Sequence, residues 1–403
     1  MIARASLAAL LALALAACGG GGGGGGGNPG AGTPLLGDDA RRAVLADLGE
    51  QLVRPALADF AQAAQALDAA LDAHAQNPQD NAAKLQARQA WVTAALAFEP
   101  IEVLQVGPAA MADQPGGQDL RDLIYAYPRR VEFQIDCLAL SGAAVDADTR
   151  IDAMGLGALE HLLYAPVNAD AASQCDEGGD VATLRAEYAG RVGSFIAAQA
   201  AALRNAWAPA GENFIADWAQ AGQGGSVYAR PQDALDALST ALFYVEKESK
   251  DRKIACPTGI GASGLACPAA DAARVEFALA GISGAALRAN VATFQAAFAG
   301  VDGGMGLNDL LRGIERGDIA DKLDAQLAAT LDWLDTEIGA DFADDVAAID
   351  SNEACINATS ARAGEPVACA LHGRIKAAMD TFRSEVVAAL SLATPDRAAG
   401  DND

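Results

Sequence analysis

Apolar residues recur every three or four positions along almost the whole chain after residue 38, with polar residues between them. This spacing matches the 3.6 residues of an α-helical turn, whereas the strict alternation of a β-strand is scarce. Alanine and leucine, both strong helix formers, dominate these stretches. The pattern therefore predicts an all-α protein, with helices over residues 38–54, 56–76, 80–106, 118–139, 152–164, 180–208, 231–253, 269–299, 307–316, 318–349 and 365–393.

Several of these helices exceed twenty residues and are joined by short connections, which is typical of antiparallel helical bundles. The ordered part of the chain is too long for one bundle core, so we expect two domains, residues 38–210 and 211–395. Their boundary falls in the glycine- and proline-containing stretch 209–229. Pro55 is expected to break or kink the first helical stretch, and residues 396–403 to form a disordered tail.

The N-terminus has the pattern of an export signal. Arg4 precedes an apolar run from Ala5 to Ala17, which is too short to span a bilayer. Two alanines stand directly before Cys18, and such small residues fit the narrow site of the lipoprotein signal peptidase. We therefore predict a signal peptide over residues 1–17 and lipidation of Cys18, with the acyl chains as a membrane anchor. An ordinary secretory signal with a chance cysteine is the alternative.

An unbroken glycine run follows the cysteine, from Gly19 to Gly27. Glycine offers no side chain for packing and high backbone freedom, so residues 18–37 are predicted to form a flexible tether. A glycine in the position after the lipidated cysteine permits delivery to the outer membrane. The expected location is therefore the cell envelope, at the outer membrane and facing the periplasm.

Acidic residues outnumber basic ones by a wide margin. The whole chain has 28 basic and 53 acidic residues and a net charge of −25. Loss of Arg4 with the signal peptide leaves −26. Such a charge argues against nucleic acid as a partner. It accommodates a metal ion, a cationic ligand or a basic protein partner more easily, although it also serves solubility.

Six cysteines remain besides Cys18. An even number in an exported chain indicates disulfide bonds, and fifteen pairings are possible in principle. The last four cysteines form two pairs, each of which brackets a short loop-like stretch. We therefore predict that each cysteine bonds to its neighbour in the sequence. These pairs are Cys137 with Cys175, Cys256 with Cys267, and Cys355 with Cys369. A zinc site is the alternative, but the chain has no Cys-x-x-Cys motif and three histidines in all.

One cluster of candidate residues lies in the helix predicted over residues 80–106. At 100° per residue, Glu99 lies about 20° and Glu102 about 40° from Arg88 around the helix axis. These three side chains therefore share a face, with Trp91 on its flank. Pro100 removes a helical hydrogen bond and should bend the helix beside the two carboxylates. A solvated charged stripe beside a core tryptophan is the alternative interpretation.

A second cluster lies at the start of the helix predicted over residues 152–164. Gly155 and Gly157 weaken a helix by up to about 1 kcal/mol each, so close approach of another helix is one reason to keep them. Glu160 and His161 stand among apolar neighbours. A buried carboxylate must be paired or shift its pKa, and Arg88 is a possible partner for Glu160.

These segments resemble the signatures of the imelysin family. Arg88-x-x-Trp91, Glu102 and Gly107-Pro108 resemble its first signature, and Tyr127-Pro128 its aromatic-proline step. The segment from Gly155 to Tyr164 resembles the family motif Gly-x-His-x-x-Glu followed by Leu-Leu. The later matches are the stretch Lys250 to Pro257, Val275-Glu276-Phe277, Ser283-Gly284 and Leu287.

The resemblance implies two helical bundles facing each other, in a periplasmic or surface protein linked to iron uptake. It places a ligand site at their interface, with Glu276 and Ser283 added to the two clusters above. The family also bears a peptidase label, and its motif histidine and glutamate are suspected metal ligands. Here Gly155 and Glu160 match that motif, but Gly157 stands in the histidine position.

His161 follows Gly157 by one helical turn and points within about 40° of its direction, so it is the candidate substitute ligand. It stands about 100° from Glu160, which is poor for shared coordination on a straight helix. The metal ligands so predicted are Glu102, Glu160 and His161, for iron or another divalent metal. No motif surrounds His74 or His372, and both are expected at the surface.

Three functions remain open at this point. The first is a binding module for iron or for a protein of an iron-uptake system, with its ligand held between the bundles. The second is a metallopeptidase, which needs three protein ligands and a metal-bound water, and which the missing motif histidine disfavours. The third is a structural role or interaction scaffold, in which Glu160 and Arg88 form an internal ion pair.

Overall fold

The chain folds into helices wherever the structure has regular secondary structure. The computed structural model describes residues 37–125, 132–167, 174–175, 177–261, 267–349, 355 and 366–395. The predicted signal peptide, Cys18, nearly all of the tether, the motif Tyr127-Pro128 and the tail 396–403 lie outside these residues. No strand occurs in the described part of the chain, so the all-α prediction is confirmed. None of its helices is long and apolar enough to cross a membrane.

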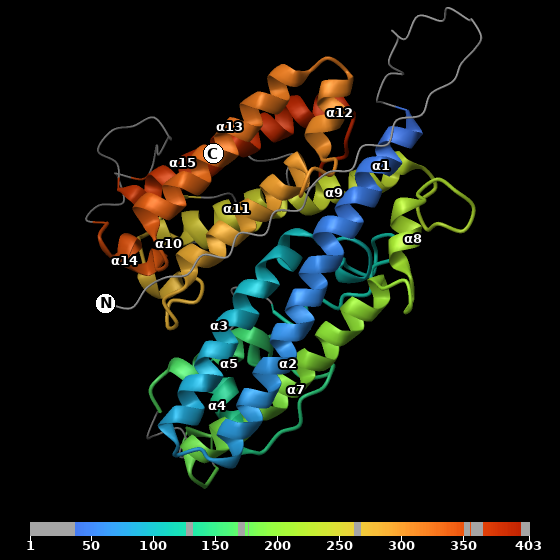
Figure 1. Cartoon of the computed structure of the whole chain (residues 1–403). Helices are drawn as coiled ribbons and strands as arrows, with labels where there is room; N and C mark the ends of the chain where they lie inside the picture. The colour runs from blue at the N-terminus through green and yellow to red at the C-terminus, as the bar shows by residue number, and fades with distance from the viewer. Residues whose placement is uncertain are drawn as a thin grey trace, which may run out of the picture. The chain divides into compact units, whose positions relative to one another are not determined.

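Long antiparallel helices build the first half of the described chain (Figure 1). Helix α2 packs against α3 and α7, while α5 and α4 pack on α7. The Asp80 and Asp180 carboxylates cap α3 and α7 by accepting hydrogen bonds from backbone N–H groups. The elements are α1 (Asp38–Leu48), η1 (Gly49–Val53), α2 (Arg54–Gln76), α3 (Asn81–Val103), η2 (Gly107–Ala109), α4 (Glu132–Leu140), η3 (Ile151–Ala153), α5 (Gly155–Tyr164), α7 (Val181–Trp207) and α8 (Phe214–Ala219).

The second half is helical as well, and its central elements are η4, α11, α13 and α15. The segment η4 is π-helical over eleven residues, and such segments are rare and often mark functional sites. The elements are α9 (Pro231–Leu242), η4 (Val245–Ala255), α10 (Cys256–Thr258), η5 (Ala272–Arg274), α11 (Ser283–Ala299), α12 (Leu307–Gly313), α13 (Gly317–Trp333), η6 (Leu334–Ile338), α14 (Phe342–Ala347), α15 (Val367–Thr381), η8 (Phe382–Val386) and α16 (Val387–Leu390).

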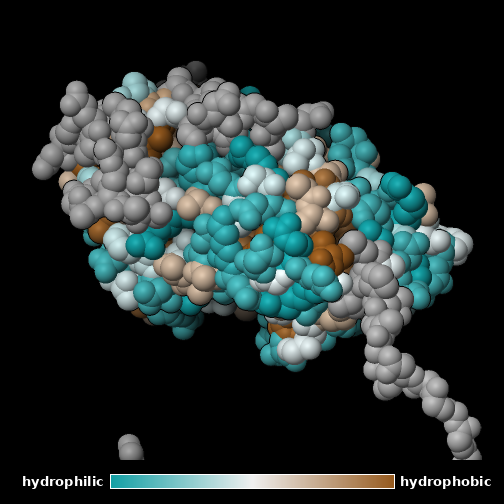
Figure 2. Space-filling model, turned by 90° about the horizontal axis from the view of Figure 1, so that it is seen from above, coloured by the Kyte–Doolittle hydropathy of each residue, from teal (hydrophilic) through white to brown (hydrophobic). Residues whose placement is uncertain are grey.

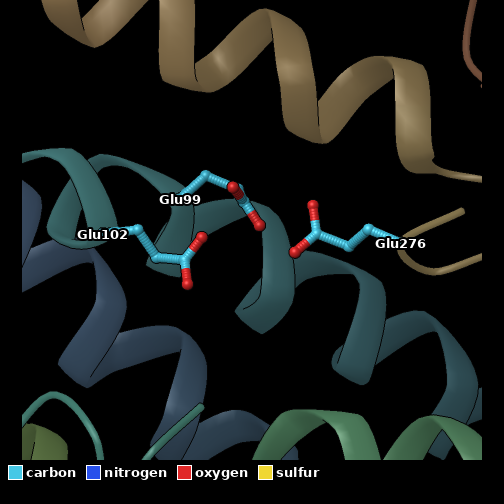
Figure 3. Close-up of side chains that lie close together, drawn as sticks. All are labelled: Glu99, Glu102 and Glu276. Atoms are coloured by element: carbon cyan, nitrogen blue, oxygen red, sulfur yellow. The ribbon is translucent and has the colours of Figure 1, made fainter. Parts of the chain in front are cut away.

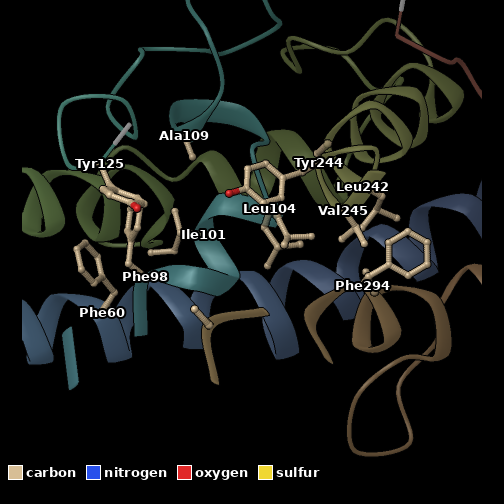
Figure 4. Packing of buried hydrophobic residues seen from close by; sticks show 14 of the residues in the cluster. Phe60, Phe98, Ile101, Leu104, Ala109, Tyr125, Leu242, Tyr244, Val245 and Phe294 are labelled. Atoms are coloured by element: carbon tan, nitrogen blue, oxygen red, sulfur yellow. The ribbon is translucent and has the colours of Figure 1, made fainter. Parts of the chain in front are cut away.

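One apolar core runs through both halves. Figure 4 shows side chains of α2 and α3 continuing into those of α9, η4 and α11. Helix α3 contacts α11 directly, and α1 contacts α9 and α12 as well as α8. The halves therefore share buried surface instead of meeting through a solvated linker. The domain boundary between residues 210 and 211 stays a prediction.

Hydrophilic residues cover most of the described surface on the face seen in Figure 2, and hydrophobic residues form small separate patches there. This distribution agrees with the large excess of acidic residues. Solvation of the charged surface is one sufficient reason for that excess.

Of the two effects expected of Pro55, a break or a kink, the break is absent. Helix α1 continues through the π-helical turn η1 into α2, with Pro55 in the first turn of α2. Proline has no N–H to donate, and both prolines and π-helical turns are places where helices bend. The polypeptide is therefore helical from Asp38 to Gln76.

Two other predicted helices begin well after the residue that the periodicity indicated. Residues 118–125 form turns and the helix there begins only at Glu132, after residues that the structure does not describe. Residues 275–282 are also non-helical, with positive φ angles at Phe277 and Gly281. A positive φ cannot continue a right-handed helix, so α11 begins at Ser283.

The three predicted disulfide bonds are confirmed. Cys137 bonds to Cys175, Cys256 to Cys267, and Cys355 to Cys369. The bond between Cys256 and Cys267 closes a short loop directly after η4. It therefore restrains the C-terminal end of the π-helical segment.

Candidate functional site

A buried ammonium group lies among three buried carboxylates where the two halves meet. The Lys253 Nζ atom is 3.1 Å from Glu99 Oε2, 2.7 Å from Glu102 Oε2 and 2.8 Å from Glu276 Oε2. All four side chains are at most 2% exposed. Figure 3 shows the carboxylates of Glu99 and Glu102 extending from α3 toward that of Glu276. We call these four residues the Lys253 cluster.

Each half of the chain contributes to the Lys253 cluster. Glu99 and Glu102 are three residues apart on α3, so their side chains project from one face of that helix. Lys253 lies near the end of the π-helical segment η4, and Glu276 lies in the non-helical stretch before α11. The contacts that join these elements are therefore ionic at this point of the core.

Further polar side chains complete the cluster. Arg121 Nη2 donates to Glu102 Oε1 at 3.0 Å, and the Tyr244 hydroxyl donates to Glu102 Oε2. The Tyr125 hydroxyl donates to Glu276 Oε1 at 2.8 Å. Asn290 Nδ2 of α11 donates to Glu99 Oε2 at 2.7 Å. Most of the buried polar atoms here are thus satisfied, as the low dielectric of a core demands.

The carboxyl groups differ in their protonation because their neighbours differ. Burial raises the pKa of Glu99 well above its ordinary range, in spite of the attraction of Lys253. Burial raises the pKa of Glu276 to about 7. Burial also acts on Glu102, but the charges of Lys253 and Arg121 outweigh it and hold its pKa below the ordinary value. Glu102 is therefore the constant anion of the cluster.

Lys253 stays charged for the same electrostatic reason. Burial alone would lower the pKa of its ammonium, but Glu102, Glu276 and Glu99 raise it well above the ordinary value. Burial and the neighbouring carboxylates also raise the pKa values of Tyr125 and Tyr244, so both hydroxyls remain hydrogen-bond donors. Lys253 and Arg121 thus supply positive charge to the buried carboxylates.

The residues predicted at the start of α3 make structural contacts. Arg88 donates from Nε and Nη2 to the Leu163 carbonyl at 2.9 Å and 2.7 Å, and lies over the Tyr164 ring. Trp91 Nε1 donates to the Leu156 carbonyl at 3.0 Å. These bonds fasten α3 to α5. The predicted pairing of Arg88 with Glu160 is replaced by the Leu163 carbonyl as the acceptor for Arg88.

Glu160 caps backbone instead of facing the triad. Its Oε1 atom accepts hydrogen bonds from the N–H groups of Leu279 at 2.9 Å and Ala280 at 3.2 Å. It is 2% exposed, so the predicted burial is correct. The bonds hold the turn that includes Phe277 and Gly281 against α5, and that turn carries Glu276. Glu160 thus positions a cluster residue from a distance.

The motif glycines allow close approach of the segment that precedes Tyr125. A Cβ atom on Gly155 would lie 2.3 Å from the Ile124 carbonyl oxygen, and the φ angle of Gly155 is +76°. A Cβ atom on Gly157 would lie 3.3 Å from the Tyr125 ring. A close approach is therefore present, but the neighbour is a loop instead of the expected helix. It places Tyr125 beside Glu276.

Replacement of Gly155 by alanine is expected to destabilise the fold by more than replacement of Gly142. Both residues have a positive φ, which costs a residue with a Cβ atom about 1–2 kcal/mol. Gly142 has no atom within 4 Å of an added Cβ, so the clash with Ile124 adds to the cost at Gly155 alone. Urea denaturation of the two variants measures the difference. Equal losses would show that the approach of Ile124 is not tight.

His161 belongs to a separate buried network. Its Nε2 atom lies 3.1 Å from Asp136 Oδ1, and Arg185 donates to both Asp136 oxygens at 2.8 Å and 2.7 Å. The predicted metal set of Glu102, Glu160 and His161 is not brought together. Among the described residues, the group that could hold a metal ion is Glu99, Glu102 and Glu276.

The structure also decides the positions of His74, His372 and Ser283. His74 and His372 are 5% and 3% exposed, so the expectation that both lie at the surface is wrong. Ser283 Oγ donates to Asp341 Oδ1 and accepts from the Phe342 N–H, which fastens the start of α11 to the segment before α14. Ser283 therefore supports the fold of the second half.

Comparison with known proteins agrees with the sequence motifs. The family model of Imelysin matches residues 53–363. The chain belongs to the imelysin family. Its fold is similar to that of an imelysin-like protein from Psychrobacter arcticum 273-4, with a TM-score of 0.64 and 18% identity, over 88% of this chain and 97% of that chain. No curated protein matches the sequence.

A second solved structure is similar to this chain to the same degree. It is a protein assigned as an iron-regulated protein A precursor from Parabacteroides distasonis ATCC 8503, with a TM-score of 0.63 and 17% identity, over 88% of this chain and 97% of that chain. At such identities the two structures show a shared fold and no more. The imelysin fold therefore accommodates the Lys253 cluster at the junction of its halves.

The family motif in this imelysin does not fit a metal ion. Gly157 offers no side-chain ligand, and one Glu160 oxygen is engaged by two backbone N–H groups. The triad of Glu99, Glu102 and Glu276 fits better, because its ligand oxygens lie within 4.8 Å of one another and are of the hard type. The Lys253 ammonium, however, lies within 3.1 Å of each of these residues.

Proposed function

We propose that this imelysin is a binding protein of the cell envelope that takes part in iron acquisition, with the triad Glu99, Glu102 and Glu276 as a cation site. In this proposal Lys253 is the built-in counter-cation of the site. The observation that carries the proposal is the placement of one ammonium within 3.1 Å of three buried carboxylates. The predicted lipid anchor at Cys18 would keep the protein beside the uptake machinery of the envelope.

The chemistry of the triad supports a cation as the ligand. Three carboxylates buried together need positive charge, which Lys253 and Arg121 supply in this structure. Carboxylate oxygens are ligands for hard cations such as ferric, manganese or calcium ions. A metal ion at the triad would take the place of the Lys253 ammonium. Lys253 lies on a π-helical segment, and a change of helical register there would move its side chain.

Hydrolysis is the second candidate, and the geometry favours it less. A metallopeptidase keeps one coordination position open for water and a base beside it. Here the centre of the triad holds an ammonium group, and His161 is bound into the network of Asp136 and Arg185. The peptidase label of the family therefore finds less support in these residues than a binding role does.

Titration with Mn²⁺ and, without oxygen, with Fe²⁺ tests the proposal. The Lys253→Met variant of the purified chain keeps the side-chain length but leaves the carboxylates without their central cation. We expect it to bind either metal at least about tenfold more tightly than the wild-type chain, because the competing ammonium is gone. Calorimetry and bound-metal analysis after desalting measure this change.

Lys322→Met serves as the matched control, because Lys322 is an exposed lysine paired with Glu385. It should bind metal as the wild-type chain does. If neither the wild-type chain nor Lys253→Met binds Mn²⁺ or Fe²⁺, the triad is not a cation site. The cluster would then be a structural link between the halves.

A further inference from the structure

A surface groove lies between the start of α2 and the C-terminal end of α7. Its volume is about 360 Å³, which is within the usual size of small-molecule sites. None of the residues of the Lys253 cluster lines it. The groove therefore requires its own explanation.

Two arginines line the groove, in a protein with a net charge of −25. The guanidinium of Arg204 has no hydrogen bond or ion pair with any part of the chain that the structure describes. Arg54 pairs with Glu50, which is the acidic residue of the lining. One guanidinium and part of another are thus available to an anion that enters the groove.

A buried donor provides the second observation. Trp207 lines the groove and is 1% exposed, and its indole N–H has no acceptor within the described residues. A buried donor without a partner costs about 1–3 kcal/mol. Proteins rarely keep such a donor without a use, and an acceptor atom of a bound molecule would satisfy it.

The floor of the groove is apolar. Pro55, Leu57 and Ala58 line it from α2, and Ala208 lines it beside the end of α7. Leu57 and Trp207 also line a second, narrower gap together with Ile101 and Leu104, and that gap is too narrow for water. A ligand body that packs on this floor removes apolar surface from water.

We propose that this groove binds a small organic anion, namely a carboxylate attached to an apolar chain or ring. The carboxylate would lie within reach of Arg54 and Arg204, and the Trp207 N–H would donate to it. The apolar body would cover Pro55 and Leu57. Inorganic phosphate matches the arginines but not the floor, so it is a poorer occupant.

Octanoate is the probe for this site, with octanamide as its uncharged match. The readout is the indole N–H signal of Trp207 in two-dimensional NMR of the purified chain, assigned from its loss in Trp207→Phe. We expect octanoate to shift this signal saturably and to bind at least about tenfold more tightly than octanamide or phosphate. Arg204→Gln should weaken octanoate by about tenfold, which corresponds to about 1.4 kcal/mol.

Arg230→Gln is the matched control, since Arg230 is an exposed arginine paired with Asp233 away from the groove lining. It should leave octanoate binding unchanged. Equal binding of octanoate and octanamide would overturn the proposal, because the arginines would then have no role. So would an equal response to phosphate, or octanoate binding that survives Arg204→Gln. None of these outcomes depends on whether the triad binds metal.

Discussion

Replacement of Glu102 by glutamine is expected to lower the free energy of unfolding by about 3–5 kcal/mol. Glu102 accepts hydrogen bonds from Lys253 at 2.7 Å, from Arg121 at 3.0 Å and from Tyr244. Glutamine keeps the volume but removes the charge. The buried Lys253 and the partly buried Arg121 would then lose their common anion, and removing one partner of a buried ion pair is the costly way to break it.

Urea denaturation at pH 7.5 measures this loss, with a check that the slope with denaturant is unchanged. Asp335→Asn is the control, because Asp335 pairs with Arg288 at the surface and both side chains are about half exposed. We expect that control to stay within about 1 kcal/mol of the wild-type chain. A loss of similar size in both variants would mean that the Lys253 cluster adds no more than a surface pair.

The double variant of Glu102→Gln and Lys253→Met measures how much of the stability comes from the interaction between these two residues. If the two charges act mainly on each other, the double variant should lose less stability than the two single losses added together. Removing both partners leaves Glu99 and Glu276, whose pKa values burial already raises, to take up protons. Simple additivity would mean that each charge depends mainly on other residues.

Local chemistry in the sequence was sufficient for the helical class, the disulfide pairs and one face of the site. The 3.6-residue period predicts helices because burial of an apolar stripe is what stabilises them. Glu99 and Glu102 project together from α3, as predicted, whereas Arg88, expected on the same face, bonds to α5. Residue spacing along one helix does not predict which side chains contact other elements. Here Glu99 and Glu102 bond to Lys253 of η4.

Lys253 shows why the rest of the site could not be predicted. It is about 150 residues from Glu102 in the chain, and no local pattern reports that two such segments meet. Its segment is π-helical, which a 3.6-residue period does not reveal. Glu160 accepts hydrogen bonds from the backbone of a turn in which Phe277 has a positive φ. Phenylalanine rarely adopts this conformation, so the sequence does not predict the turn.

The free energy of unfolding is expected to fall as the pH rises from about 5 to 7, and Glu276→Gln should make this fall less steep. Burial raises the pKa of Glu276 from an ordinary value of 4.5 to about 7. Between these values the folded chain keeps a proton that the unfolded chain releases. Stability then declines with pH, by up to about 1.4 kcal/mol per pH unit for one such group.

Glu102 and Lys253 both keep their charge between about pH 5 and 7. Glu102 has a lowered pKa, so its contribution is present above 4.5 and is lost only as the pH falls further. Lys253 has a raised pKa, so its contribution persists until the pH passes its ordinary value of 10.5 and rises toward the folded one. Glu99, whose pKa burial also raises, declines in the same direction as Glu276 and remains in the variant.

The difference between the wild-type and Glu276→Gln profiles isolates Glu276 from every group that both chains share. Asp345 is the most useful control, because burial raises its pKa to about 6 at a site in α14 outside the Lys253 cluster. Asp345→Asn should change the slope around pH 5 to 6 and leave the slope around pH 7 as it is. Parallel profiles for the wild-type chain and Glu276→Gln would show that the Glu276 carboxyl titrates alike in the folded and unfolded chains, as a group open to water would do.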